Sequence, residues 1–182
     1  MTGGKKGLTP YLNVCTIILL MSALPSGAKD DTLSIGRDAN AADIERWDID
    51  VGPDGDGLPA GSGTARQGEK IYLEKCADCH GSDGQKGRDK LAGPPGDGRK
   101  KTIGNYWPYA TTIFDYIRRA MPPATPGSLS SDELYALTAW LLHLNSIITT
   151  DDEMNAETLP LLRMPALNRF VPDDRLGGPE VR

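Results

Sequence analysis

The sequence has few of the residues from which a large hydrophobic core is built. Only 38% of its 182 residues are hydrophobic and 6% are aromatic, whereas glycine (21) and proline (14) are frequent. This composition indicates one modest domain with long loops rather than two full domains. A prosthetic group at its centre would compensate for the thin core. Cysteine (3) and histidine (2) are also scarce, so a four-ligand metal site would need nearly all of them.

Positive charge is in deficit, with 20 lysine and arginine residues against 25 aspartate and glutamate residues. Nucleic acids and anionic membrane surfaces attract basic proteins, so the acidic balance argues against both as partners. It favours docking on a basic patch of another protein.

Long apolar runs are missing except near the N-terminus. There two lysines precede the run YLNVCTIILLMSAL, which is too short for a membrane span, and the small residues of PSGA follow. The pattern predicts a signal peptide over residues 1–28, hence export to the periplasm and no membrane span in the mature chain. A retained membrane anchor is the alternative. Cleavage would remove Cys15 and leave only Cys76 and Cys79, in an oxidising compartment.

Capping motifs and apolar periodicity predict three main helices. The first begins at a capping box formed by Thr64 and Gln67, and the third begins at a second box formed by Ser130 and Glu133. The second helix fits YATTIFDYIRRA and ends before MPPATPG, because prolines cannot continue a helix. Apolar residues at spacings of three and four give the third helix one apolar face.

The helices define an all-α domain over residues 64–147 with an extension at each end. Residues 29–63 are rich in glycine, proline and aspartate and are predicted to be a linker-like N-terminal extension. Residues 148–182 hold few periodic apolar residues and are predicted to be a C-terminal tail rather than a domain.

The stretch CADCH has three interpretations. A zinc site would need Cys76, Cys79, His80 and His143, but the adjacent second cysteine and histidine point apart. A thiol redox pair belongs at a helix N-terminus after a strand, whereas these cysteines end a helix. Haem attachment uses every residue, since cysteines three apart bind the two vinyl groups and the following histidine ligates the iron. We therefore predict one covalent haem c.

The second axial ligand of the iron is predicted to be Met121. It lies 41 residues after His80, where a helix ends and prolines extend the chain. Methionine/histidine ligation is typical of electron-transfer cytochromes, and filling both iron faces argues against a haem enzyme or gas sensor with an open site. Met164 is the second choice, ahead of Met154 and His143.

Three aromatic residues precede the second helix. The polar tips of Tyr106, Trp107 and Tyr109 are candidates to bind the haem propionates, and simple packing is equally open. The apolar pocket around the haem, which excludes water and favours the reduced state, is predicted to be formed by Ile71, Phe114, Ile117 and Leu141.

The segments QGEKIYLEKCADCH, RRAMPP and LTAWLLHL resemble class I cytochrome c. This resemblance implies three main helices around one covalently bound haem. It also implies that Gly68, Tyr72 and Trp140 pack where the first and last helices cross. The sequence differs from the family after the histidine, where LAGPPG replaces Gly-Pro-x-Leu. The carbonyl that accepts the proton of His80 is therefore expected within Leu91–Pro95.

A narrower resemblance covers more of the chain. The segments RWDIDVGPDGDGLPAGSG and KTIGNYWPYATTIFDYIRRAMP are similar to the cytochrome subunit of bacterial sulfite dehydrogenases. This implies an electron-transfer subunit reduced by a molybdenum-cofactor subunit and oxidised by a downstream cytochrome c or oxidase. The resemblance does not separate the sulfite-oxidising from the sulfane-oxidising type. A free-standing periplasmic carrier is the alternative, but a minimal carrier has no use for the extensions.

The extensions contain apolar residues that a free linker would not need. Trp47 is expected to anchor the N-terminal extension on the domain. The apolar residues of both extensions are expected to pack on the haem domain or on a partner subunit, and the narrower resemblance favours the partner. Deleting residues 148–182 is then expected to spare haem attachment and weaken the complex. These apolar residues are Trp47, Leu159, Leu161, Leu162, Met164, Leu167 and Phe170.

Overall fold

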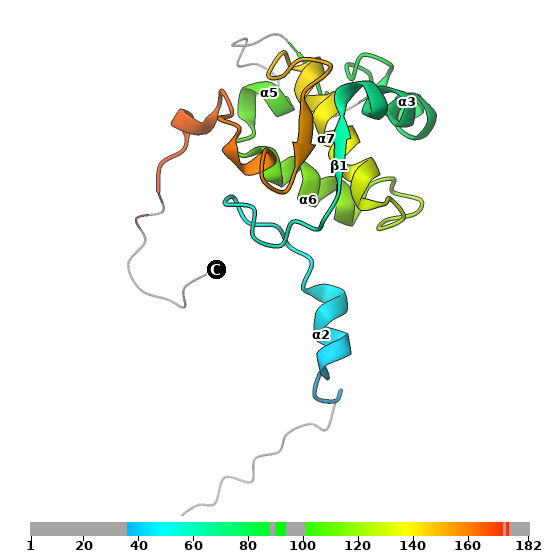
Figure 1. The fold of residues 1–182 in the computed structure, drawn as a ribbon, viewed down its shortest axis with the longest axis vertical. Helices are drawn as coiled ribbons and strands as arrows, with labels where there is room; N and C mark the ends of the chain where they lie inside the picture. The colour runs from blue at the N-terminus through cyan, green and yellow to red at the C-terminus, as the bar shows by residue number, and fades with distance from the viewer. Residues whose placement is uncertain (1–35, 88–89, 94–100, 173, 175–182) are drawn as a thin grey trace, which may run out of the picture. The chain divides into compact units, whose positions relative to one another are not determined.

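The computed structural model describes residues 36–87, 90–93, 101–172 and 174 (Figure 1). The predicted signal peptide and the pair Pro94–Pro95 lie outside the described residues. The chain divides into two compact units, residues 1–40 and 41–182, and all elements given below belong to the second. Within the described ranges, no helix is both long enough and apolar enough to cross a membrane.

The second unit is mostly helical, as the sequence predicts. Its three main helices are α3, α6 and α7, and its two short strands form one antiparallel pair that the sequence did not predict. The elements in chain order are α2 (Ala41–Trp47), β1 (Ser62–Thr64), α3 (Ala65–Lys75), α4 (Ala77–His80), α5 (Ile103–Tyr106), α6 (Ala110–Ala120), α7 (Ser131–Leu144), β2 (Glu153–Asn155) and the 3₁₀ turns η1 (Leu159–Leu161) and η2 (Leu167–Arg169).

Both predicted capping boxes are present. The backbone N–H of Thr64 donates to Gln67 Oε1 at 2.8 Å, and the backbone N–H of Ser130 donates to Glu133 Oε2 at 2.9 Å. In each box the hydroxyl also accepts from the backbone N–H three residues later. These bonds satisfy donors that the first turn of a helix leaves unpaired, so each helix begins where the sequence predicts.

Helices α3 and α7 cross closely at Gly68, as the resemblance implies. A Cβ atom at this position would lie 1.9 Å from the carbonyl oxygen of Ala136 and 2.9 Å from the Cβ of Trp140. One turn further along α3, the ring of Tyr72 contacts that of Trp140, with centroids 6.3 Å apart. Only glycine allows the two backbones to approach this closely.

The hydrophobic core lies between the three main helices. Phe114 on α6 packs on Tyr135 of α7, with ring centroids 4.7 Å apart, and both side chains are fully buried. The residues predicted to line the haem pocket join this core, three of them buried and one partly buried. They are Phe114, Ile117, Leu141 and, partly buried, Ile71.

The C-terminal extension packs on the domain, contrary to the preference for a partner subunit. Strand β2, the orange arrow beside β1 in Figure 1, pairs with β1 in antiparallel fashion. In this pairing Met154 lies opposite Gly63. Met154, Leu159 and Met164 are then buried in the core. Of the two expected surfaces, the haem domain is therefore the one used. The segment escaped prediction as part of the domain because these residues enter the core from a strand, a 3₁₀ turn and an irregular stretch, which carry no helical periodicity.

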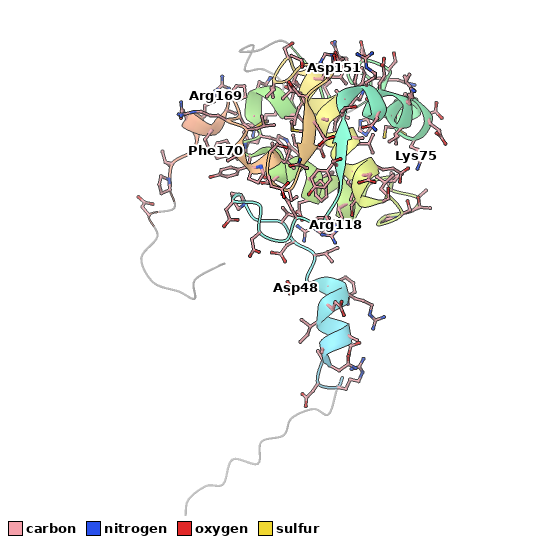
Figure 2. All side chains as sticks on the ribbon, viewed as in Figure 1. Asp48, Lys75, Arg118, Asp151, Arg169 and Phe170 are labelled. Atoms are coloured by element: carbon pink, nitrogen blue, oxygen red, sulfur yellow. The ribbon has the colours of Figure 1, made fainter. Side chains whose placement is uncertain are left out.

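The expectation that Trp47 anchors the N-terminal extension was also wrong. Its side chain is 84% exposed, and α2 contributes no buried residue. The following segment is held by the partly buried Val51 and Leu58, which pack against the core, and by polar contacts. The guanidinium of Arg118 donates to the carbonyl of Ile49 at 3.0 Å (Figure 2), and the hydroxyl of Tyr135 donates to the carbonyl of Pro59 at 2.8 Å.

Candidate haem site

The CADCH segment forms the junction between two helices. Cys76 ends α3 and begins α4, and its carbonyl accepts hydrogen bonds from the backbone N–H groups of Cys79 and His80, at 3.2 and 3.1 Å. This single turn fixes the three side chains relative to one another. Cys76 is partly buried against the core, whereas Cys79 is exposed, and neither forms a disulfide.

The segment after His80 is held by backbone contacts. Gly81 has a φ of 77°, a left-handed conformation that favours glycine, and its carbonyl accepts the hydroxyl of Tyr72 at 2.9 Å. The carbonyl of His80 accepts the backbone N–H of Lys86 at 2.9 Å. Burial, followed by the nearby Cys76 and Asp83, raises the pKa of Tyr72 to about 12, so this hydroxyl remains a donor.

The imidazole of His80 has an unsatisfied atom. Its Nδ1 is buried and has no hydrogen-bond partner among the described residues. The carbonyl of Leu91, one of the expected acceptors, already accepts from the backbone N–H of Ile103 and from the side-chain amide of Asn145. Leu91 is therefore not the partner, and Pro94 and Pro95 lie outside the described residues.

Burial raises the pKa of the Cys76 thiol, the opposite of what a catalytic redox cysteine requires. The structure does not favour the zinc interpretation either. The Nδ1 of His143 lies 3.2 Å from the carbonyl of Ile148, and its ring contacts that of Trp140. Among the described residues, no cluster of three or more histidine, cysteine or acidic side chains is suited to hold a metal ion.

The predicted axial methionine stands at the end of α6. The backbone N–H of Met121 donates to the carbonyl of Ile117 at 3.0 Å, and its side chain is partly buried against the core. The prolines that follow stop the helix at this residue. Met164, the second choice, is instead buried within the core.

The three aromatic candidates lie at and after α5. Trp107 packs edge-on against Tyr116, and Tyr106 packs in the same way against Phe170, with centroids 5.8 and 5.6 Å apart. The Nζ of Lys101 lies 4.0 Å above the ring of Tyr106. The polar tips of Tyr106, Trp107 and Tyr109 have no hydrogen-bond partner within the part of the chain that is described.

Asn145 is a residue of the site that the sequence analysis missed. It directly follows α7, and its side-chain amide donates to the carbonyls of Leu91 and Leu141 at 3.1 and 2.8 Å. It thereby fastens the loop after the CADCH segment to the last helix. An asparagine at a helix C-terminus was the available signal, but its partner lies 54 residues away.

The donor set and its surroundings fit a c-type haem. Two thiols three residues apart and an imidazole lie on one turn, and Cys76, Trp107 and Met121 all border the same hydrophobic core. The buried indole nitrogen of Trp140, like Nδ1 of His80, has no partner among the described residues. Buried polar atoms are rarely left unpaired, so these atoms are consistent with a polar prosthetic group beside the core.

Comparisons with known proteins agree with this geometry. Residues 63–141 match the family model described as cytochrome c oxidase, cbb3-type, subunit III. Among solved structures, the chain is similar to a chain of the sulfane dehydrogenase SoxCD from Paracoccus pantotrophus. The two are 40% identical with a TM-score of 0.70, over 79% of this chain and 73% of that chain. No curated protein matches the sequence.

Proposed function

Because this chain belongs to the cytochrome c family, we propose that it is a mono-haem subunit that takes electrons from a molybdenum-cofactor subunit oxidising sulfur compounds. The similarity to the sulfane dehydrogenase chain carries the proposal. It covers 79% of this chain, whereas the family model is confined to residues 63–141, so the likeness includes part of the extensions. A free-standing carrier, the alternative function, would need only the haem domain.

In this proposal, Cys76 and Cys79 would hold one haem c through thioether bonds, and His80 and Met121 would ligate its iron. Bound haem would supply one-electron chemistry. The turn that begins at Cys76 presents two thiols and an imidazole together, and the proline-terminated end of α6 presents the thioether. With both axial positions filled by protein, oxygen or peroxide would find no open site.

The core residues set the conditions for electron transfer. Phe114 and Leu141 belong to the buried core against which Cys76 packs, and a surrounding from which water is excluded favours the less charged, reduced state. Tyr106, whose hydroxyl has no hydrogen-bond partner among the described residues, remains a candidate propionate ligand, together with Trp107 and Tyr109.

The proposal places the protein in the periplasm, supported by the signal-like pattern of residues 1–28 and by the attachment of c-type haems outside the cytoplasm. A downstream cytochrome c or oxidase would then accept the electrons. The type of sulfur substrate follows from the partner, and the similarity to a sulfane dehydrogenase makes a thiol-bound sulfane as good a candidate as sulfite.

Substrate-dependent reduction tests the proposal. The oxidised holoprotein is mixed with the molybdenum-cofactor subunit purified from the same organism, sulfite or a thiol-bound sulfane is added, and haem absorbance is followed. Oxidation of sulfite to sulfate with water releases two electrons and two protons, so each sulfite should reduce two chains.

Substrate without the molybdenum subunit is the control and should reduce the haem far more slowly. If neither substrate reduces a haem that dithionite reduces readily, the proposed function is wrong. If unrelated cytochromes reduced the haem of this chain as fast as the molybdenum-cofactor subunit does, a free-standing carrier would be the better interpretation.

A further inference from the structure

Helix α2 presents an apolar face that nothing described in the chain covers. Ala41, Ile44 and Trp47 recur every three residues and share one side of the helix. The side chains of Ile44 and Trp47 are 54% and 84% exposed. Burial of such side chains is favourable because their apolar surface leaves water.

The helix also lacks the packing that usually stabilises so short an element. It has seven residues, and isolated helices shorter than about 12–15 residues are marginal in water. Its internal support is an ion pair between Arg46 and Asp43 at 2.9 Å and a hydrogen bond from Arg46 to the carbonyl of Ala42. Such pairs stabilise an isolated helix only weakly. Docking on another surface would supply the missing stabilisation.

Charge identifies the kind of surface that fits. Residues 41–60 contain six carboxylates and one arginine, a net charge of −5. The remainder of the chain is balanced, with 19 acidic and 19 basic residues, so the acidity of the whole chain resides in this segment. A complementary surface therefore has a basic rim around an apolar groove.

We propose that α2 is a docking helix that lays Ile44 and Trp47 into an apolar groove with a basic rim on the molybdenum-cofactor subunit. The proposal rests on the function proposed above and names the surface that serves it. An isologous pair of this chain would bring two segments of charge −5 together, and an anionic lipid surface would repel them. Tryptophan is enriched among the residues that dominate binding energy in interfaces, and short apolar helices commonly bind in grooves.

Only a short stretch of chain separates the docking helix from the haem domain. Trp47 is two residues before Ile49, a span of at most about 7 Å, and the carbonyl of Ile49 is held by Arg118 of α6. Figure 2 labels Asp48 and Arg118 on either side of this connection. Because α6 ends at Ala120, a partner bound to α2 would be held near the end of α6. A short tether of this kind raises the effective concentration of the partner.

Equilibrium binding without substrate tests the docking helix independently of electron transfer. Full-length holoprotein is titrated with the purified molybdenum-cofactor subunit, and the dissociation constant is measured for wild type, Trp47→Ala and Ile44→Ala. Each substitution should weaken binding at least tenfold. The matched control is Leu161→Ala, whose side chain is 81% exposed on η1 and which should change binding less than twofold.

Two charge variants test the basic rim. Glu45→Gln with Asp48→Asn should slow association severalfold at low salt and flatten its salt dependence, because two attractive carboxylates are removed. If the combined variant binds with the salt dependence of the wild type, the proposal of a basic rim on the partner is wrong.

The outcomes separate the two proposals. If the molybdenum subunit reduces the wild-type haem but binds Trp47→Ala as tightly as wild type, the docking helix is wrong and the proposed function stands. If the wild type binds through Trp47 but no sulfur substrate reduces the haem, the docking helix stands and the function is wrong. A dimer of the chain alone that Trp47→Ala dissociates, or binding to anionic vesicles, would assign α2 to a different occupant and overturn the proposal.

Discussion

Met121 and Met164 carry the same side chain in different surroundings. Met121 ends a helix and is partly buried at the border of the core, whereas Met164 is 2% exposed inside it. Replacing Met121 with alanine should remove the soft axial ligand, so the reduction potential falls and the weak sulfur-to-iron absorption of the oxidised protein near the red edge disappears. Redox titration and the absorption spectrum measure both effects. An unchanged reduction potential would show that Met121 is not a ligand of the iron.

The matching substitution Met164→Ala should change the stability of the protein and leave the properties of the haem unchanged. The spectrum and potential should stay as in wild type, and the free energy of unfolding should fall by about 2–5 kcal/mol because the substitution leaves a cavity in the core. Urea unfolding of the holoprotein measures the loss. A shifted potential with unchanged stability would make Met164 the ligand instead.

Gly68 should tolerate no added methyl group. In an open helix, replacing glycine with alanine stabilises by about 0.5–1 kcal/mol. At the α3/α7 crossing the new Cβ would meet the carbonyl of Ala136, so Gly68→Ala should instead destabilise by about 1–3 kcal/mol. The neighbouring exposed Glu69→Ala is the control and should change stability by less than about 0.5 kcal/mol. A stabilised Gly68→Ala would mean that the helices can separate at little cost.

At the level of elements, Lys75 and Glu133 join the end of α3 to the start of α7 across 2.6 Å. The hydrogen bond from Lys75, followed by that from the backbone of Ser130, lowers the pKa of Glu133 below its ordinary value of 4.5. A lowered folded-state pKa contributes stability that is present above about pH 4.5 and is lost as the pH falls through the folded pKa.

Glu133→Gln keeps a capping side chain but removes this charge. It should lower the free energy of unfolding at pH 7 by less than about 1 kcal/mol, and the difference should vanish in acid. Unfolding curves at several pH values measure it. The control is Asp151→Asn, because Asp151 pairs with Arg66 in open solvent, and it should leave the curves unchanged. A difference that persists unchanged in acid would exclude the charge of Glu133 as its cause.

Local signals explain which elements the sequence could predict. The starts of α3 and α7 follow from four residues each, and the end of α6 follows from prolines, so all three helices were predicted closely. Strands β1 and β2 are three residues long and lie some ninety residues apart. Their pairing depends on the assembled domain, and no local sequence pattern indicates it. The hydrogen bond from Asn145 to the carbonyl of Leu91 was not predicted for the same reason.

The C-terminal extension behaves as part of the domain. Deleting residues 148–182 would remove β2 and three buried side chains, Met154, Leu159 and Met164, from the core. The expectation that the truncated chain attaches haem normally is therefore replaced by a loss of stability and of haem content. Haem per chain and the urea midpoint measure it. The control deletes only residues 173–182 and keeps those side chains. A full-length haem yield from the longer deletion would contradict the packing.

At the scale of the whole molecule, the two extensions have different roles despite similar composition. The C-terminal one contributes apolar residues to the core, and Arg169 of its η2 turn donates to the carbonyl of Asn105 (Figure 2). The N-terminal one packs the partly buried Val51 and Leu58 against the core but leaves Ile44 and Trp47 exposed. The sequence predicted that both carry apolar residues in need of a surface. Which surface each one uses depends on long-range contacts, so composition alone could not decide it.

The prediction of a haem site rests on a local pattern. Two cysteines and one histidine within five residues are the signature of covalent attachment, and reading it needs no knowledge of the fold. A donor to the propionates and an acceptor for the proton of His80 would have to come from more distant segments, and the sequence offers several candidates for each.

The central claim is that Cys76 and Cys79 bind one haem covalently. The direct measurement is the mass of the mature chain purified from a host that attaches c-type haems, after denaturation in acid and organic solvent. We expect the mass to be increased by one haem in the wild type. Cys76→Ser or Cys79→Ser alone should give a mixture of chains with and without haem, and the double variant should give only chain without haem. A wild-type chain that loses its haem under these conditions, or that retains two, would show that the two cysteines do not bind one haem covalently.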